Sequence, residues 1–81
     1  MNKEINEKVF EIVREVFARP ELVVTLDTTA ADVQGWDSFS HMSLIVMIEE
    51  SFGIAFETEE IGMMGRVGDL ATLVEQKLTG V

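Results

Sequence analysis

The chain has 81 residues and a formal net charge of −9 at pH 7, with no cysteine and one histidine. A chain of this length forms one small domain, here residues 1–81, whose modest core is too small for most catalytic scaffolds. The lack of cysteine excludes a disulfide framework and a cysteine-based metal site, and a single histidine excludes a cluster of histidine ligands.

The negative charge is concentrated in the middle of the chain. No lysine or arginine lies between Pro20 and Gly65. Such a field argues against nucleic acid as a partner, because phosphate binding needs basic side chains, and it favours proteins with basic patches. Acidity can also simply keep a small domain soluble. The acidic residues of this segment are Glu21, Asp27, Asp32, Asp37, Glu49, Glu50, Glu57, Glu59 and Glu60.

Residues 4–18 have the pattern of an amphipathic helix, with apolar side chains at three- and four-residue spacing. Pro20 disfavours helical geometry at the preceding residue, so we expect it to end this helix. The first residues are polar, and no apolar run reaches the length of a membrane span. We therefore expect a cytoplasmic monomer that does not insert into membranes.

Residues 19–36 form a long connection. The apolar run from Leu22 to Leu26 has no second run to pair with as a strand, so we expect a loop that places these groups under the helices. A turn with side-chain caps is expected at residues 27–32. The aspartates of this region lack the spacing and the terminal glutamate of a calcium-binding EF-hand loop, so no metal site is predicted.

Residues 38–52 form the central predicted helix. Asp37 is a preferred N-cap, and Ser38 follows it in the first turn, where a phosphate on its hydroxyl would be tolerated. At about 100° per residue, the apolar side chains separate into two faces. One face holds Leu44, Ile45, Ile48 and Phe52, which are expected in the core, and His41, which is expected to pack at the helix boundary. The other holds Phe39, Met42 and Val46 beside Glu49, and it is either covered by residues 54–64 or exposed for partners.

The end of the chain predicts two more helices. Gly53 is a stop signal for the central helix, and Thr58 can cap a short helix over residues 58–63. Residues 67–79 form the last helix, with Gly80 as its stop and a core stripe of Val67, Leu70, Ala71, Val74 and Leu78. The predicted fold is therefore all-α, a small bundle of three main helices plus a short one before the last.

The segment from Gly35 to Phe39, with the apolar run after it and the Gly53-Ile54 pair, resembles the carrier motif of the acyl carrier protein family. The resemblance covers nearly the whole chain. It implies that a phosphopantetheinyl transferase attaches 4′-phosphopantetheine to Ser38, beside the cap residue Asp37, and that acyl groups travel on it as thioesters. It also implies a short helix that lines an acyl pocket. The partner-facing residues it implies are Phe39, Met42, Val46, Glu49, Glu50 and Glu57.

The sequence also departs from the carriers of fatty-acid synthesis. Phe39 replaces the usual leucine after the serine, Ser43 stands where an acidic residue is common, and Trp36 is more typical of specialised or modular carriers. A polyketide, peptide or specialised lipid pathway is therefore as well supported as fatty-acid synthesis, and a carrier of D-alanine or another aminoacyl group stays open.

Two readings from other classes compete with the carrier. In the first, the chain is an unmodified acidic helical interaction domain, and Ser38 is only a residue of the helix start. In the second, Ser38 and His41 form a catalytic pair. Two residues on one short helix would lack a pocket and an oxyanion hole, so we predict that the chain is not an enzyme and has no catalytic residues.

Overall fold

The computed structural model describes residues 3–79. The all-α prediction is confirmed, and the bounds of the central and last helices are as predicted. The predicted stop at Gly80 lies outside the described residues. No helix in the described range is long and apolar enough to cross a membrane. The elements are α1 (Lys3–Val16), the short 3₁₀ helix η1 (Ala30–Asp32), α2 (Ser38–Phe52), α3 (Thr58–Gly62) and α4 (Val67–Thr79).

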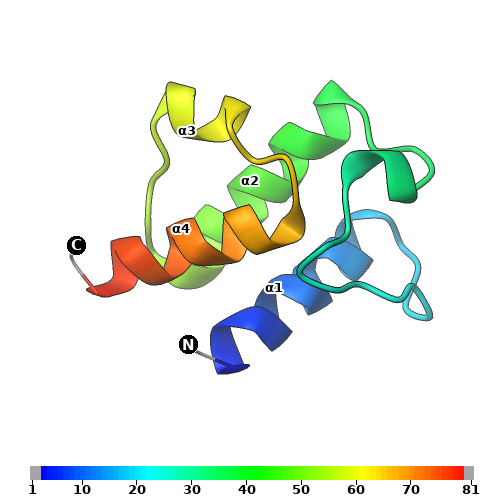
Figure 1. Ribbon diagram of the computed structural model, residues 1–81, viewed down its shortest axis with the longest axis horizontal. Coiled ribbons are helices and arrows are strands. Elements are labelled where there is room, and N and C mark those ends of the chain that lie inside the picture. The colour runs from blue at the N-terminus through cyan, green and yellow to red at the C-terminus, as the bar shows by residue number, and fades with distance from the viewer. Residues whose placement is uncertain (1–2, 80–81) are drawn as a thin grey trace.

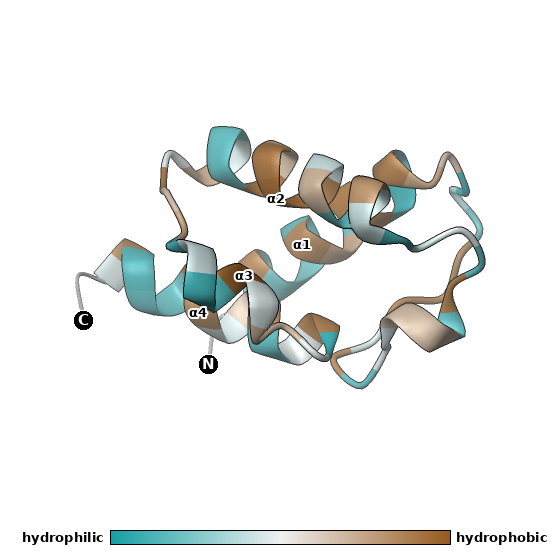
Figure 2. Ribbon diagram, turned by 90° about the horizontal axis from the view of Figure 1, so that it is seen from above, coloured by the Kyte–Doolittle hydropathy of each residue, from teal (hydrophilic) through white to brown (hydrophobic). Residues whose placement is uncertain are grey.

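The core lies between α1, α2 and α4. α1 packs against both of the other long helices, and α3 lies beyond them on the side away from α1 (Figure 1). Figure 2 shows hydrophobic residues along much of α2, which supplies the centre of this core. The largest fully buried side chains come from all three long helices: Val9, Val13, Leu44, Ile45, Ile48, Val67, Leu70 and Val74.

The end of α1 differs from the prediction. The helix stops two residues earlier than expected, and Ala18 adopts the left-handed conformation with φ at 54°. Its N–H donates to the Glu15 carbonyl at 3.1 Å, and the Arg19 N–H donates to the Arg14 carbonyl at 3.0 Å. These two bonds form a Schellman motif, which satisfies the last carbonyls of the helix. The helix is therefore closed before Pro20 is reached.

The connection between α1 and α2 buries fewer apolar groups than predicted. Val24 is buried, but Val23 is 79% exposed and Leu26 is 38% exposed. The expected turn contains η1, a 3₁₀ helix that the sequence analysis did not predict. The expectation that this whole run lies under the helices was therefore wrong for Val23 and Leu26.

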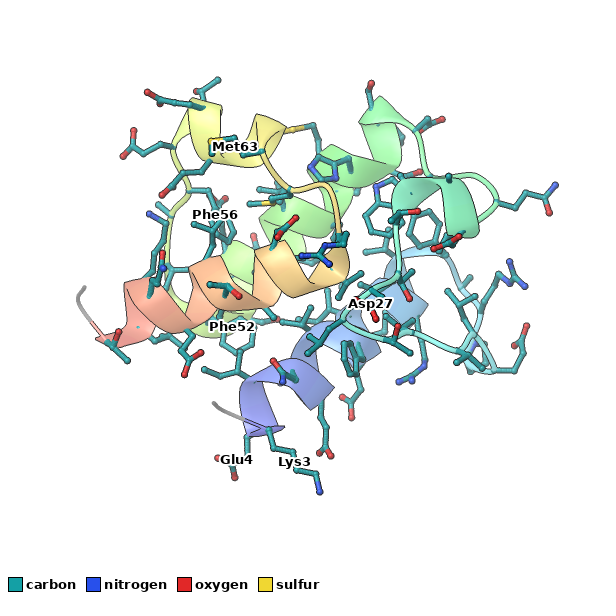
Figure 3. The ribbon with its side chains drawn as sticks, viewed as in Figure 1. Lys3, Glu4, Asp27, Phe52, Phe56 and Met63 are labelled. Carbon is teal, nitrogen blue, oxygen red and sulfur yellow. The ribbon has the colours of Figure 1, made fainter. Side chains whose placement is uncertain are left out.

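Backbone contacts fix the same connection to the start of α4. The Val67 N–H donates to the Thr28 carbonyl at 2.8 Å, and the Gly68 N–H donates to the Leu26 carbonyl, also at 2.8 Å. Figure 3 shows Asp27, between these two acceptors, next to the first turn of α4. The main chain of this loop is therefore held directly against the first turn of α4.

α3 is held by polar contacts at its start. Its N-cap is Glu57, one residue before the predicted cap Thr58, which is the first residue of the helix. Glu60 Oε1 accepts the Glu57 N–H at 2.7 Å and also pairs with Nζ of Lys77, on α4, at 2.9 Å. The hydrogen bond from Glu57 and then the contact with Lys77 lower the pKa of Glu60. The carboxylate form of Glu60 therefore links α3 to α4.

The apolar residues at the end of α3 differ in their burial. Ile61 and Met64 pack against the core. Met63 is 74% exposed, since α3 ends at Gly62, one residue before the predicted end. Leu78, which was expected in the core stripe of α4, is 45% exposed as well.

Candidate functional site

Asp37 and Ser38 start α2. Asp37 is the N-cap, as predicted, and its Oδ1 accepts the Ser40 N–H at 2.9 Å. Hydrogen bonds from the backbone and the side chain of Ser40 lower the pKa of Asp37, so the cap stays charged at neutral pH. The side chain of Ser38 is exposed. Its hydroxyl therefore lies at the end of α2 that favours anions.

The residues before α2 are fixed from two directions. Gly35 has φ at 91°, a conformation that favours glycine, and its carbonyl accepts a hydrogen bond from Ser40 Oγ at 3.0 Å. The Trp36 ring lies against Phe17, which follows α1, with ring centroids 5.3 Å apart. No local pattern in the sequence links Phe17 to Trp36, which lies 19 positions later.

His41 joins the start of α2 to α3. Its Nδ1 lies 3.2 Å from the Trp36 indole Nε1, and its Nε2 lies 3.3 Å from the Ile61 carbonyl oxygen. The indole can only donate, so Nδ1 accepts and Nε2 carries the proton that it donates to Ile61. With both ring nitrogens engaged in this way, His41 is not oriented to act as a base for Ser38.

Ser38 opens onto a shallow groove of about 510 Å³ between the start of α2, the residues before it and α3. The walls are mostly apolar, and Asp37 is the acidic residue among them. The groove brings together residues from three segments: Ala30, Trp36, Asp37, Ser38, His41, Met42, Ile61 and Gly62.

The second apolar face of α2 is exposed. Phe39 is 80% exposed, Met42 is 47% exposed and Val46 is 45% exposed; we call these three residues the α2 strip. Ser43 and Met47 line a shallow hollow together with them. Of the two arrangements that the sequence left open, residues 54–64 as a cover and an exposed face, the structure has the second. Contiguous exposed apolar groups of this kind mark surfaces that contact other molecules.

The three acidic residues expected to face partners lie in different surroundings. Glu49 is half-buried, and its Oε2 accepts the Phe56 N–H at 2.8 Å, which fixes the segment between α2 and α3. Figure 3 shows Phe56 in this segment, close to α4, and the Lys77 ammonium lies 5.9 Å from the centre of its ring. Glu50 and Glu57 are exposed. Glu49 therefore stabilises the segment between α2 and α3.

The aspartates considered as metal ligands make separate contacts. Asp32 Oδ2 accepts the Thr29 N–H at 2.9 Å, Asp27 lies 3.5 Å from Arg66, and Asp37 caps α2. Residues 3–79 contain no group of three or more side chains that could hold a metal ion.

Comparison with known proteins identifies the family. The model for the phosphopantetheine attachment site matches residues 7–74. An acyl carrier protein of Streptococcus pyogenes serotype M3 is 42% identical over 71 residues, which cover 88% of this chain and 92% of that protein. The chain belongs to the acyl carrier protein family. An acyl carrier protein of Thermotoga maritima is 30% identical over 76 residues, 94% of each chain.

A solved structure agrees with this assignment. The solution NMR structure of a holo acyl carrier protein from Geobacter metallireducens is 41% identical, with a TM-score of 0.87, and the match covers 94% of this chain and 87% of that one. The predicted resemblance, the fold and the 4′-phosphopantetheine cofactor are therefore confirmed. The start of α2 fits this cofactor, because an exposed hydroxyl meets a helix N-terminus and a mostly apolar groove.

Proposed function

We propose that Ser38 is the residue that carries 4′-phosphopantetheine in this acyl carrier protein. The observation that supports this most is the position of its exposed hydroxyl at the first residue of α2, on the groove and within the family match. A separate transferase would join Ser38 Oγ to the 4′-phosphate of coenzyme A, with the nucleotide 3′,5′-bisphosphate as leaving group. The bound cofactor supplies a thiol for thioesters, which this cysteine-free chain lacks.

We propose that partner enzymes dock on the α2 strip and on the acidic residues around it. Phe39, Met42 and Val46 offer apolar area, and a methionine in such a surface adapts to different partners. Glu50 and Glu57 are exposed and attract basic patches, whereas Glu49 contributes charge from a half-buried position. The chain would then deliver cargo in the cytoplasm as a monomer, without catalysis of its own.

We also propose that the pathway is a specialised one. Phe39 after the serine, Ser43 in place of an acid and Trp36 before the cap all depart from the carriers of fatty-acid synthesis. Phe39 and Ser43 line the same hollow, so both changes fall on the proposed docking surface. Polyketide, peptide, specialised lipid and aminoacyl cargo are the classes that this surface would serve.

Intact-protein mass spectrometry tests the attachment site. The wild type is incubated with coenzyme A and a broad-specificity phosphopantetheinyl transferase, beside Ser38→Ala and Ser51→Ala. Ser51 is an exposed serine in the last turn of the same helix and serves as the matched control. We expect one added phosphopantetheine on the wild type and on Ser51→Ala, and none on Ser38→Ala. A folded wild type that accepts no cofactor would overturn the proposal in favour of an unmodified acidic interaction domain.

A further inference from the structure

Trp36, His41 and the Ile61 carbonyl form a chain of hydrogen bonds across the groove, which we call the His41 link. Its two bonds, of 3.2 and 3.3 Å, connect residues up to 25 positions apart in the sequence. The Trp36 ring also faces the imidazole, with centroids 6.1 Å apart and ring planes inclined by 30°. The link therefore joins the residues before α2, α2 itself and α3 in one place.

α3 depends on contacts of this kind. It has five residues, too few for a stable helix by itself. The Glu60–Lys77 pair holds it to α4, and the packing of Ile61 holds it to the core. The His41 link adds a polar contact between α3 and α2. Figure 3 shows the end of α3, marked by Met63, on the same side of the molecule as the start of α2.

The link also lies where cargo would enter the protein. Ser38, His41 and Ile61 line the same groove. Deeper in α2, Leu44, Ile45 and Ile48 are at most 1% exposed, so the helix is fully packed below the groove. A chain attached at Ser38 that passed between α2 and α3 would have to separate His41 from Ile61.

We propose that His41 is a positioning residue that holds α3 against α2 and keeps the cargo of this carrier outside the helical core. The inference rests on the proposed attachment at Ser38. It assigns the carrier to short or polar acyl and aminoacyl groups, because a long alkyl chain kept at the surface gains little from hydrophobic burial.

The first test uses the apo protein and needs no cofactor. The chain has one tryptophan and one histidine, so the NMR signals of the Trp36 indole and of the His41 imidazole each report on one residue. In the wild type we expect an imidazole protonated at Nε2 and an indole proton that exchanges slowly with solvent, because both groups are hydrogen-bonded. His41→Phe removes the acceptor, and its indole proton should exchange faster. Equal exchange rates in the two proteins, or an imidazole protonated at Nδ1, would overturn the link.

The second test uses the holo protein loaded with acetyl or dodecanoyl thioesters, and measures cleavage by hydroxylamine. In the wild type we expect similar rates for both chains. In His41→Asn, which cannot reach Ile61, the dodecanoyl thioester should be cleaved about tenfold more slowly than the acetyl one, because the longer chain can enter between α2 and α3. Lys77→Gln loosens α3 at its other contact and controls for general mobility.

Three results would overturn the assignment. Protection of the dodecanoyl thioester in the wild type would show that cargo already enters the core. Equal rates for both chains in His41→Asn would show that His41 is not what excludes it. Protection in Lys77→Gln equal to that in His41→Asn would make the effect one of α3 mobility alone. If Ser38 accepts no cofactor, the cargo assignment fails with the proposed function, whereas the NMR test on the apo protein still decides the link.

Discussion

The two apolar faces of α2 differ in their surroundings and not in their chemistry. Leu44, Ile45 and Ile48 on the core face are at most 1% exposed, whereas the α2 strip is 45% to 80% exposed. α1 covers the first face, and the α2 strip stays uncovered by residues 3–79. Hydrophobicity along the helix therefore does not decide which side is buried. What decides it is the number of long helices available to cover a face, and the surplus apolar area becomes a contact surface.

Truncation of one residue on each face of α2 should show the difference between the two faces most clearly, as a difference in stability. Ile48→Ala removes a fully buried side chain and should lower the free energy of unfolding by about 2–5 kcal/mol. Val46→Ala, on the α2 strip, should change it by less than about 0.5 kcal/mol. Urea denaturation followed by circular dichroism measures both. A Val46→Ala loss as large as that of Ile48→Ala would show that the α2 strip belongs to the core.

Two glycines allow the close contact between α4 and the loop before α2 to be compared with the open surface of α3. A Cβ on Gly68 would lie 2.7 Å from the Leu26 carbonyl oxygen, whereas a Cβ on Gly62 has no neighbour within 4 Å. Gly68→Ala should therefore destabilise the fold by about 1–3 kcal/mol, because the loop must move away from α4. Gly62→Ala should be neutral or stabilising by up to about 1 kcal/mol. Thermal melting tests both, and equal melting temperatures would contradict the close approach at Gly68.

The sequence predicts α2 well because its ends depend on local signals. Asp37 caps the helix with its own side chain, and Gly53 adopts φ at 68° where the helix stops. The predicted end of α1 lies two residues too late, because the left-handed residue there is alanine and not glycine. Nothing in the residue type marks Ala18 as a stop.

The candidate site was predictable only in part for a similar reason. The positions of Asp37 and Ser38 follow from capping, and the sequence left the exposure of the α2 strip as one of two possibilities. The contacts of His41 with Trp36 and Ile61 depend on how α3 packs against α2, and no sequence pattern specifies a bond between side chain and backbone 20 positions apart. The exposed side chains of Val23 and Met63 also follow from packing and not from their hydrophobicity.

The left-handed conformation of Ala18 at the end of α1 allows a test with a smaller expected effect on stability. A left-handed conformation costs an ordinary residue about 1–2 kcal/mol, and glycine loses about 0.5–1 kcal/mol of that gain through backbone entropy. Ala18→Gly should therefore stabilise the protein by up to about 1.5 kcal/mol. Ala55 is exposed, lies outside the helices and has a negative φ, so Ala55→Gly should give no gain. Chemical denaturation of both variants measures the difference, and a stabilising Ala55→Gly would refute this explanation.

Removal of the charge of Glu60, on α3, should have the smallest effect on the melting temperature. Its pKa is lowered in the folded state, so the stability it contributes is complete above the ordinary glutamate pKa and is lost as the pH falls through the lowered pKa. Glu60→Gln keeps an oxygen for the Glu57 N–H but removes the charge that pairs with Lys77. Its melting temperature should be slightly below that of the wild type at neutral pH and equal to it in acid. Glu59→Gln, in the same turn, controls for the change in net charge. A difference that persists in acid would show that the side chain, and not its ionisation, holds α3.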